Sequence, residues 1–197
     1  MFIGLTGGIA CGKSTVSKFL AQKGAIIVDA DLIARLIVAP GSEGLNQLQA
    51  CFGSDILDEH GDLHRPSLGK IVFADPEKRN LLEKITHPLI AKESNRQITE
   101  ALAQNPPLVV YDAALLFESG RADAFRPVVV VYVNREEQVK RIMARDGISA
   151  QDAQKRIDAQ MSVEQKVALA DFKIDNSGDL DDLSQQVDAL FAQLCSK

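Results

Sequence analysis

The chain has 197 residues, a hydrophobic fraction of 46%, a charged fraction of 25% and a formal net charge of −5 at pH 7. These values are typical of a globular domain, and they argue against a disordered or fibrous chain and against a protein that coats nucleic acid. The three cysteines match no disulfide or metal-binding spacing, the first residues show no signal-peptide pattern, and no apolar run is long enough to span a membrane. We therefore expect a soluble protein of the reducing cytoplasm that has neither nucleic-acid nor membrane partners.

Short apolar runs predict a parallel β-sheet that is covered on both faces. Four runs are strong and a fifth, at 172–174, is weaker; the strong ones are 2–5, 25–28, 108–111 and 128–133. Helical patterns such as 14–23 and 136–144 separate the runs, and 179–197 has the pattern of a closing amphipathic helix. This alternation predicts an α/β fold built on a doubly wound parallel sheet of about five strands.

Two long segments between the predicted strands show helical patterns and no strand signal. The first, 32–107, is expected to form an inserted helical lobe, in which Pro66 starts a helix and Pro88 interrupts or restarts one. The second, 135–170, carries many charges and is expected to form a helical lid. The core domain would then consist of 1–31, 108–134 and 171–197.

Residues 7–14, Gly-Gly-Ile-Ala-Cys-Gly-Lys-Ser, match the phosphate-loop pattern G-x-x-x-x-G-K-[ST] between a predicted strand and a predicted helix. Glycines let such a loop turn its backbone amides toward phosphate oxygens, and the following helix adds the positive end of its dipole. Lys13 would reach the β- and γ-phosphates and Ser14 would bind Mg²⁺. The fold is therefore expected to be of the P-loop NTPase type. The predicted ATP contacts in this loop are Gly8, Ala10, Cys11, Gly12, Lys13, Ser14 and Thr15.

The loop alone does not say how the nucleotide is used. The chain lacks the Asn-Lys-x-Asp element that reads guanine, and it is short for a motor or transport ATPase. Phosphoryl transfer to a small molecule is the reading that these exclusions favour. A kinase of another small acceptor, such as a nucleoside monophosphate, and a non-catalytic nucleotide-binding regulator are the alternatives.

Acidic residues follow two of the predicted strands. Asp29 and Asp31 come after the second strand, and Asp112 closes the third in the manner of a Walker B strand. Ligands bind beyond the carboxyl ends of such strands, so Asp29 or Asp31 is expected to accept a proton or to hold Mg²⁺ through water. Alternatively, Asp31 caps a helix over 32–38. Asp112 is expected to orient Mg²⁺ through water, and Glu118 is a weaker candidate.

Together these motifs resemble the dephospho-CoA kinase family, and the resemblance runs from Ile3 to about Gly178. The motifs that carry it are 5–9 with 12–15, Asp29-Ala30-Asp31 with Ala34-Arg35, 61–65 with Leu68 and Val72-Phe73, 87–90, Asp112 with 115–118, 141–145, and 175–178. The resemblance implies that ATP, with Mg²⁺, phosphorylates the ribose 3′-hydroxyl of dephospho-CoA. The product would be CoA, so this would be the last step of coenzyme A biosynthesis.

The resemblance also assigns roles to residues outside the loop. Asp31 would be the catalytic base, whereas the residues that bind dephospho-CoA would be Asp29, Arg35, Arg65 and His87. His87 precedes Pro88, and the residue before a proline avoids helical conformation. His87 is therefore expected either to leave the helix and aim its ring into the substrate cleft or to be a purely structural histidine.

Two arginines and one asparagine complete the predicted site. Arg141 and Arg145 are four residues apart, so a helix would place both on one face; this is either an ordinary solvated face or, as the resemblance implies, a lid that closes over the phosphates. Asn176 would lie near the adenine. Ala114 stands where the family usually has proline, which predicts a less rigid loop after the third strand.

Cys11 has two interpretations. It lies inside the phosphate loop, near a helix N-terminus and the loop lysine, and both would lower the pKa of its thiol. The alternative is that this position simply requires a small side chain.

Overall fold

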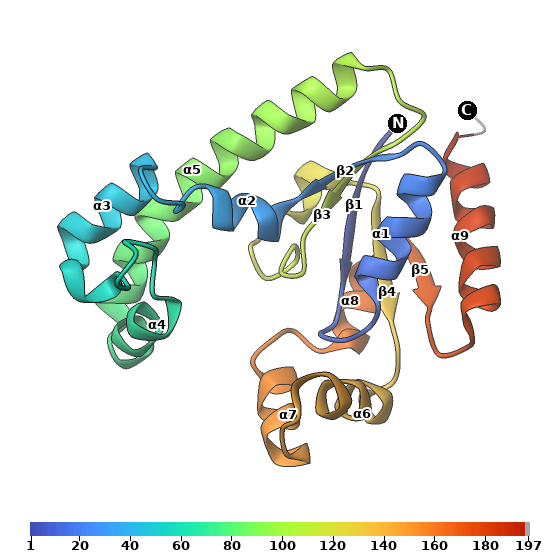
Figure 1. The fold of residues 1–197 in the computed structure, drawn as a ribbon. Helices are drawn as coiled ribbons and strands as arrows, with labels where there is room; N and C mark the ends of the chain where they lie inside the picture. The colour runs from blue at the N-terminus through green and yellow to red at the C-terminus, as the bar shows by residue number, and fades with distance from the viewer. Residues whose placement is uncertain (196–197) are drawn as a thin grey trace. The chain divides into compact units, whose positions relative to one another are not determined.

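The computed structural model describes residues 1–195, and the chain divides into two compact units (Figure 1). Met1–Asp29 and the chain from Ala101 onward form the first, which we call the sheet unit. Ala30–Glu100 form the second, the helical unit. Each is described by itself.

The sheet unit contains five parallel strands in the order β2-β3-β1-β4-β5. The strands are β1 Phe2–Gly7, β2 Ile26–Asp29, β3 Val109–Asp112, β4 Val128–Tyr132 and β5 Phe172–Asp175. Helices flank the sheet, so the predicted α/β fold with a doubly wound parallel sheet is confirmed. All five strands run in the same direction, and their carboxyl ends therefore share one edge of the sheet.

The helices of the sheet unit are α1 Lys13–Gln22, α6 Arg135–Asp146, α7 Ala150–Asp158, α8 Val163–Leu169 and α9 Leu180–Cys195, together with the short 3₁₀ helix η2 Ala122–Phe125. Side chains of α1 and α9 pack in one buried cluster with strand residues such as Ile3 and Val131. The predicted closing helix is thus present as α9, and residues 196–197 of that prediction lie outside the described residues. None of the helices within 1–195 combines the length and the hydropathy that a membrane-spanning helix requires.

The helical unit has its own small core. Its elements are α2 Ala30–Leu36, α3 Glu43–Phe52, the 3₁₀ helix η1 Ser54–Ile56, α4 Arg65–Ala74 and most of α5 Pro76–Ala103. Val38, Leu48, Ile56 and Leu68 are buried together in it. Ser42 caps α3 by accepting a 3.2 Å hydrogen bond from the backbone amide of Leu45.

The two prolines of the predicted lobe behave differently. Pro66 lies in the first turn of α4, where its missing amide costs nothing, as predicted. Pro88 lies inside α5, which continues through it, so the predicted interruption is wrong. A proline inside a helix removes one backbone hydrogen bond, at a cost of about 3 kcal/mol. The remaining turns of this 28-residue helix outweigh that cost.

Candidate active site

The phosphate loop joins β1 to α1 at the carboxyl edge of the sheet (Figure 1). Ala10 and Gly12 have φ angles of 59° and 85°, in the left-handed region. Alternation of this kind turns backbone amides toward a common point and forms an anion-binding concavity. Gly12 is the N-cap of α1, and within the described chain no side chain caps that helix. The helix N-terminus is thus left for a phosphate group to complete.

Lys13, Ser17 and Asp112 form a polar cluster beside the loop. The Lys13 ammonium pairs with Asp112 Oδ1, and the Ser17 hydroxyl donates a 2.5 Å hydrogen bond to Asp112 Oδ2. Asp112 is buried, and Asp29 lies opposite it in the register of β2 and β3. The acids that end two strands are therefore neighbours at this edge, as their sequence positions predict.

The oxygen donors at this edge fit Mg²⁺. Ser14 is exposed in the first turn of α1, so its hydroxyl is accessible to a metal ion bound on the phosphates. Both oxygens of Asp112 already accept protein donors, which suits contact with Mg²⁺ through water better than direct ligation. Mg²⁺ characteristically keeps several waters and takes few protein ligands beside substrate phosphates.

A cavity of about 710 Å³ opens beside the loop and is large enough for a nucleotide. Its lining includes Ala10, Gly12, Thr15, Arg141 and Asn176. The Arg141 guanidinium donates a 2.9 Å hydrogen bond to the backbone oxygen of Asn176. Arg141 and Asn176 are distant from the phosphate loop along the chain, and the fold brings both to it, as predicted for the nucleotide site. Residues 178–181, which lead from the loop after β5 into the start of α9, also line this cavity and were not expected to do so.

Arg145 does not lie with Arg141 in this cavity's described lining. Its guanidinium forms hydrogen bonds of 2.7 and 3.0 Å with Asp146, and Arg156 binds the same carboxylate at 2.5 Å. The hydrogen bond to Asp146 raises the pKa of Arg145 and lowers that of Asp146. Helical spacing alone did not reveal this competing partner, and the lid role of Arg145 stays a prediction.

Cys11 is fully buried, and burial raises the pKa of its thiol. The expected lowering of that pKa is wrong, because desolvation of the thiolate outweighs the nearby cations Arg141 and Lys166. A Cβ at Gly8 would lie only 2.9 Å from the Cys11 sulfur. This tight packing accords with the alternative that the position requires a small side chain.

The helical unit brings two predicted acceptor-binding cations together. Arg35, in the last turn of α2, and Arg65, at the start of α4, line the same cavity of about 350 Å³. Asp62 and the apolar residues 38–40 also line it. Both arginines are exposed, so their guanidinium groups can form bidentate hydrogen bonds with an anionic ligand.

Two expectations in the helical unit are wrong. Asp31 does not cap a helix over 32–38, because α2 begins at Ala30 and places Asp31 in its first turn. His87 does not leave the helix at Pro88, because α5 is continuous there; its side chain is exposed on that helix. Neither observation tests the roles of Asp31 and His87, which stay predictions.

Two buried polar residues at the loop were missed by sequence reasoning. The Lys166 side chain is fully buried, and Gln138 is 2% exposed. A signal was available for both, because each lies at helical spacing from a buried apolar residue: Lys166 three positions after Val163, and Gln138 four before Ile142. Polar residues on the apolar face of a helix are exceptions that call for an explanation.

Comparisons with known proteins show the family to which the chain is related. The family model described as dephospho-CoA kinase matches residues 1–182. A protein of Geobacter sulfurreducens named dephospho-CoA kinase is 46% identical over 191 residues, with 97% of each chain covered. A solved Thermus thermophilus structure matches with a TM-score of 0.83 and 34% identity, covering 98% of this chain and 96% of that one. The solved dephospho-CoA kinase of Campylobacter jejuni matches with a TM-score of 0.68 and 29% identity, covering 99% and 97%.

Proposed function

Because the chain belongs to the dephospho-CoA kinase family, we propose that it transfers the γ-phosphoryl group of ATP to the ribose 3′-hydroxyl of dephospho-CoA. The observation that carries this proposal is the cavity in which the phosphate loop, Arg141 and Asn176 meet. It offers backbone amides, a cation and a helix N-terminus to one polyphosphate. The reaction would take place in the cytoplasm.

The sheet unit would bind the nucleotide. Backbone amides of the loop would surround the β- and γ-phosphates, and Lys13, already held at the loop by Asp112, would reach the transferred group. Mg²⁺, on the Ser14 hydroxyl and through water on Asp112, would neutralise charge on the phosphates when bound. Arg141 would stabilise the charge on the transferred group, and Asn176 would lie near the adenine.

The helical unit would bind the acceptor. The groove between Arg35 and Arg65 suits a diphosphate, since each guanidinium can present two parallel donors to phosphate oxygens. Asp29 and His87 would supply further contacts to dephospho-CoA. Asp31 would accept the proton of the ribose 3′-hydroxyl while the oxygen of that hydroxyl attacks the γ-phosphorus. We propose that 32–107 act as the acceptor lobe, and that 135–170 close as a lid that excludes water.

Coupled ADP release tests the acceptor. Purified protein with ATP and Mg²⁺ should release ADP rapidly only when dephospho-CoA is added, and phosphorus NMR of the product should place the new phosphate on the 3′-oxygen. A nucleoside monophosphate should not substitute for dephospho-CoA. Equal ADP release with that alternative acceptor, or none with dephospho-CoA, would contradict the proposal.

A further inference from the structure

Backbone carbonyls at alternate positions of the phosphate loop accept hydrogen bonds from buried side chains of three other segments. The bonds run from Lys166 Nζ to Gly7, from Gln138 Nε2 to Ile9 and from Asn176 Nδ2 to Cys11, at 3.3, 2.9 and 2.8 Å. In a planar trans peptide, the carbonyl and the following amide point in opposite directions. The three bonds therefore turn the next amides, those of residues 8, 10 and 12, away from the donors. Ala10 and Gly12 line the nucleotide cavity.

Lys166 is placed for this role by a complete set of partners. Its ammonium has three N–H donors and lies within hydrogen-bond distance of three acceptors: the carbonyls of Gly7 and Ala114 and the carboxylate of Glu118, the last two at 2.8 Å. Glu118 also accepts the backbone amide of Met161. A buried charge is tolerated when it is paired and hydrogen-bonded in this way. Because Glu118 offsets the positive charge, Lys166 acts on the loop more through its hydrogen bond to the Gly7 carbonyl than through electrostatic attraction of the nucleotide.

Two of the loop's three glycines, Gly8 and Gly12, make room for the two amide side chains. A Cβ at Gly8 would lie 2.5 Å from Gln138 Nε2, and a Cβ at Gly12 would lie 2.0 Å from Asn176 Nδ2. Both distances are far below a normal contact between carbon and nitrogen. The absence of a side chain at these glycines therefore lets Gln138 and Asn176 reach the loop carbonyls.

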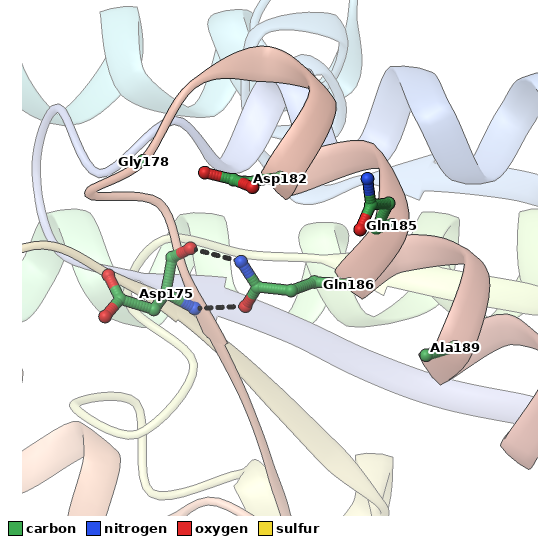
Figure 2. A pocket seen from close by; sticks show the side chains of 6 residues that line it. All are labelled: Asp175, Gly178, Asp182, Gln185, Gln186 and Ala189. Atoms are coloured by element: carbon green, nitrogen blue, oxygen red, sulfur yellow. Dashed lines mark hydrogen bonds between the residues drawn. The ribbon is translucent and has the colours of Figure 1, made fainter.

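The segment that presents Asn176 is itself fixed. The Gln186 amide of α9 accepts a 3.0 Å hydrogen bond from the backbone amide of Asp175 and donates one of 2.7 Å to its carbonyl (Figure 2). Both backbone groups of the residue before Asn176 are therefore held. Asn176 is only 9% exposed, and its own backbone amide bonds to the carbonyl of Tyr132.

We propose that Lys166 and Gln138, together with Asn176, are positioning residues that arrange the phosphate loop before a nucleotide arrives. A loop without these hydrogen bonds samples other conformations, and the apparent dissociation constant rises in inverse proportion to the fraction of time that the loop spends in its binding conformation. Lys166 lies on α8 and Gln138 on α6, so the region 135–170 is attached to the loop near both of its ends, and the proposed lid closure is left to the residues between them. The proposal rests only on the nucleotide-binding half of the proposed function.

Direct nucleotide binding tests these roles without the acceptor. In calorimetric titrations with ATP and Mg²⁺, Lys166→Met and Gln138→Met should each raise the dissociation constant by about ten-fold. Gln138→Glu keeps the size but replaces the donor with an acceptor that repels the Ile9 carbonyl, so it should weaken binding more than Gln138→Met. In turnover, the KM for ATP should rise with little change in the KM for dephospho-CoA.

The matched control is Asp171→Asn. Asp171 pairs with Arg126 at 2.8 Å beside the start of β5, at the amino edge of the same sheet. It should lower the melting temperature and leave ATP affinity unchanged. Lys166→Met leaves the Glu118 carboxylate without its cation and could fold poorly for that reason. The double variant Lys166→Met/Glu118→Gln removes that charge, and the Gln138 variants test the proposal without either change.

Wild-type ATP affinity in folded Lys166 and Gln138 variants would overturn the proposal and leave these residues a purely structural role. The variants could bind ATP more weakly while the wild-type protein fails to phosphorylate dephospho-CoA. That result would support the positioning roles and reject dephospho-CoA as the acceptor. No nucleotide binding by the wild-type protein would reject both.

Discussion

In the sheet unit, the side chains that arrange the phosphate loop are buried and hydrogen-bonded, whereas in the helical unit Arg35, Arg65 and His87 are exposed. The first arrangement loses its conformational entropy when the protein folds, so a nucleotide meets a loop that is already ordered. In the second, where we propose that the acceptor binds, the exposed side chains would be ordered only at the moment of binding. The difference predicts that mutations in the two units will separate into effects on nucleotide affinity and effects on the acceptor.

The largest expected effect is on catalysis, from Asp31→Asn in the helical unit. Loss of the base should lower kcat by about 10²- to 10⁴-fold and leave ATP affinity nearly unchanged. Steady-state kinetics and ATP titration measure both. Asp29→Asn is the matched variant: it removes the same charge, but Asp29 lies in the sheet unit. A larger loss of kcat with Asp29→Asn would transfer the base role to Asp29.

The next effect is on nucleotide affinity, from Gly12→Ala in the sheet unit. The new Cβ would meet Asn176 at a backbone φ of 85°, so ATP binding should weaken by about 100-fold or more. Gly120→Ala is the control, because its φ is 67° and a Cβ there has nothing within 4 Å. It should cost stability of about 1 kcal/mol and no ATP affinity. Equal ATP affinities for the two variants would contradict the predicted effect of the contact with Asn176.

A smaller effect is expected from Arg65→Met in the acceptor groove. Loss of one guanidinium should raise the KM for dephospho-CoA by about ten-fold, with ATP affinity unchanged, since a charged hydrogen bond contributes about 1.5–3 kcal/mol. Arg79→Met, which removes an exposed arginine paired with Glu83 on α5, should leave both constants unchanged. If Arg65→Met also weakened ATP binding, the separation of the two units would fail.

The smallest effect concerns stability in acid. Hydrogen bonds from Arg96 and Gln97 lower the pKa of Glu93 from 4.5 to about 2. Because the folded-state pKa is depressed, the stabilisation is present above pH 4.5 and is lost as pH falls toward 2. Arg96 is half-exposed, so the contribution should stay below about 1 kcal/mol. Urea unfolding should show Glu93→Gln less stable than wild type near neutral pH, with the gap closing in acid; a constant gap would contradict this assignment.

Local signals in the sequence predicted the framework of the sheet unit well. The apolar runs located all five strands to within a few residues, because a strand buried on both faces must be apolar throughout. The loop motif located the bend between β1 and α1, since its glycines and lysine have few other uses together. Arg35 and Arg65 line one groove, and their assignment to the same substrate stays a prediction.

The other expectations from single residues missed interactions that compete with or override the pattern used for them. Pro88 has a strong local preference to end a helix, and the long helix around it overrides that preference. Arg145 has the right spacing to join Arg141, but its guanidinium binds Asp146, the next residue in the chain, and its lid role stays a prediction. Lys166 looks like any surface lysine until the carbonyls of Gly7 and Ala114 are brought to it by the fold.

β2 and β3 lie side by side in the sheet, with Ile26 opposite Val109, yet the entire helical unit separates them along the chain. That unit is therefore the crossover connection between two adjacent parallel strands, a task that a single helix usually performs. The parallel pairing requires only that the chain return from the carboxyl end of β2 to the amino end of β3. A change in the length or content of this connection should therefore leave the pairing of β2 with β3 in place. Over evolutionary time, a lineage with this architecture can exchange what it phosphorylates while it inherits how it holds ATP.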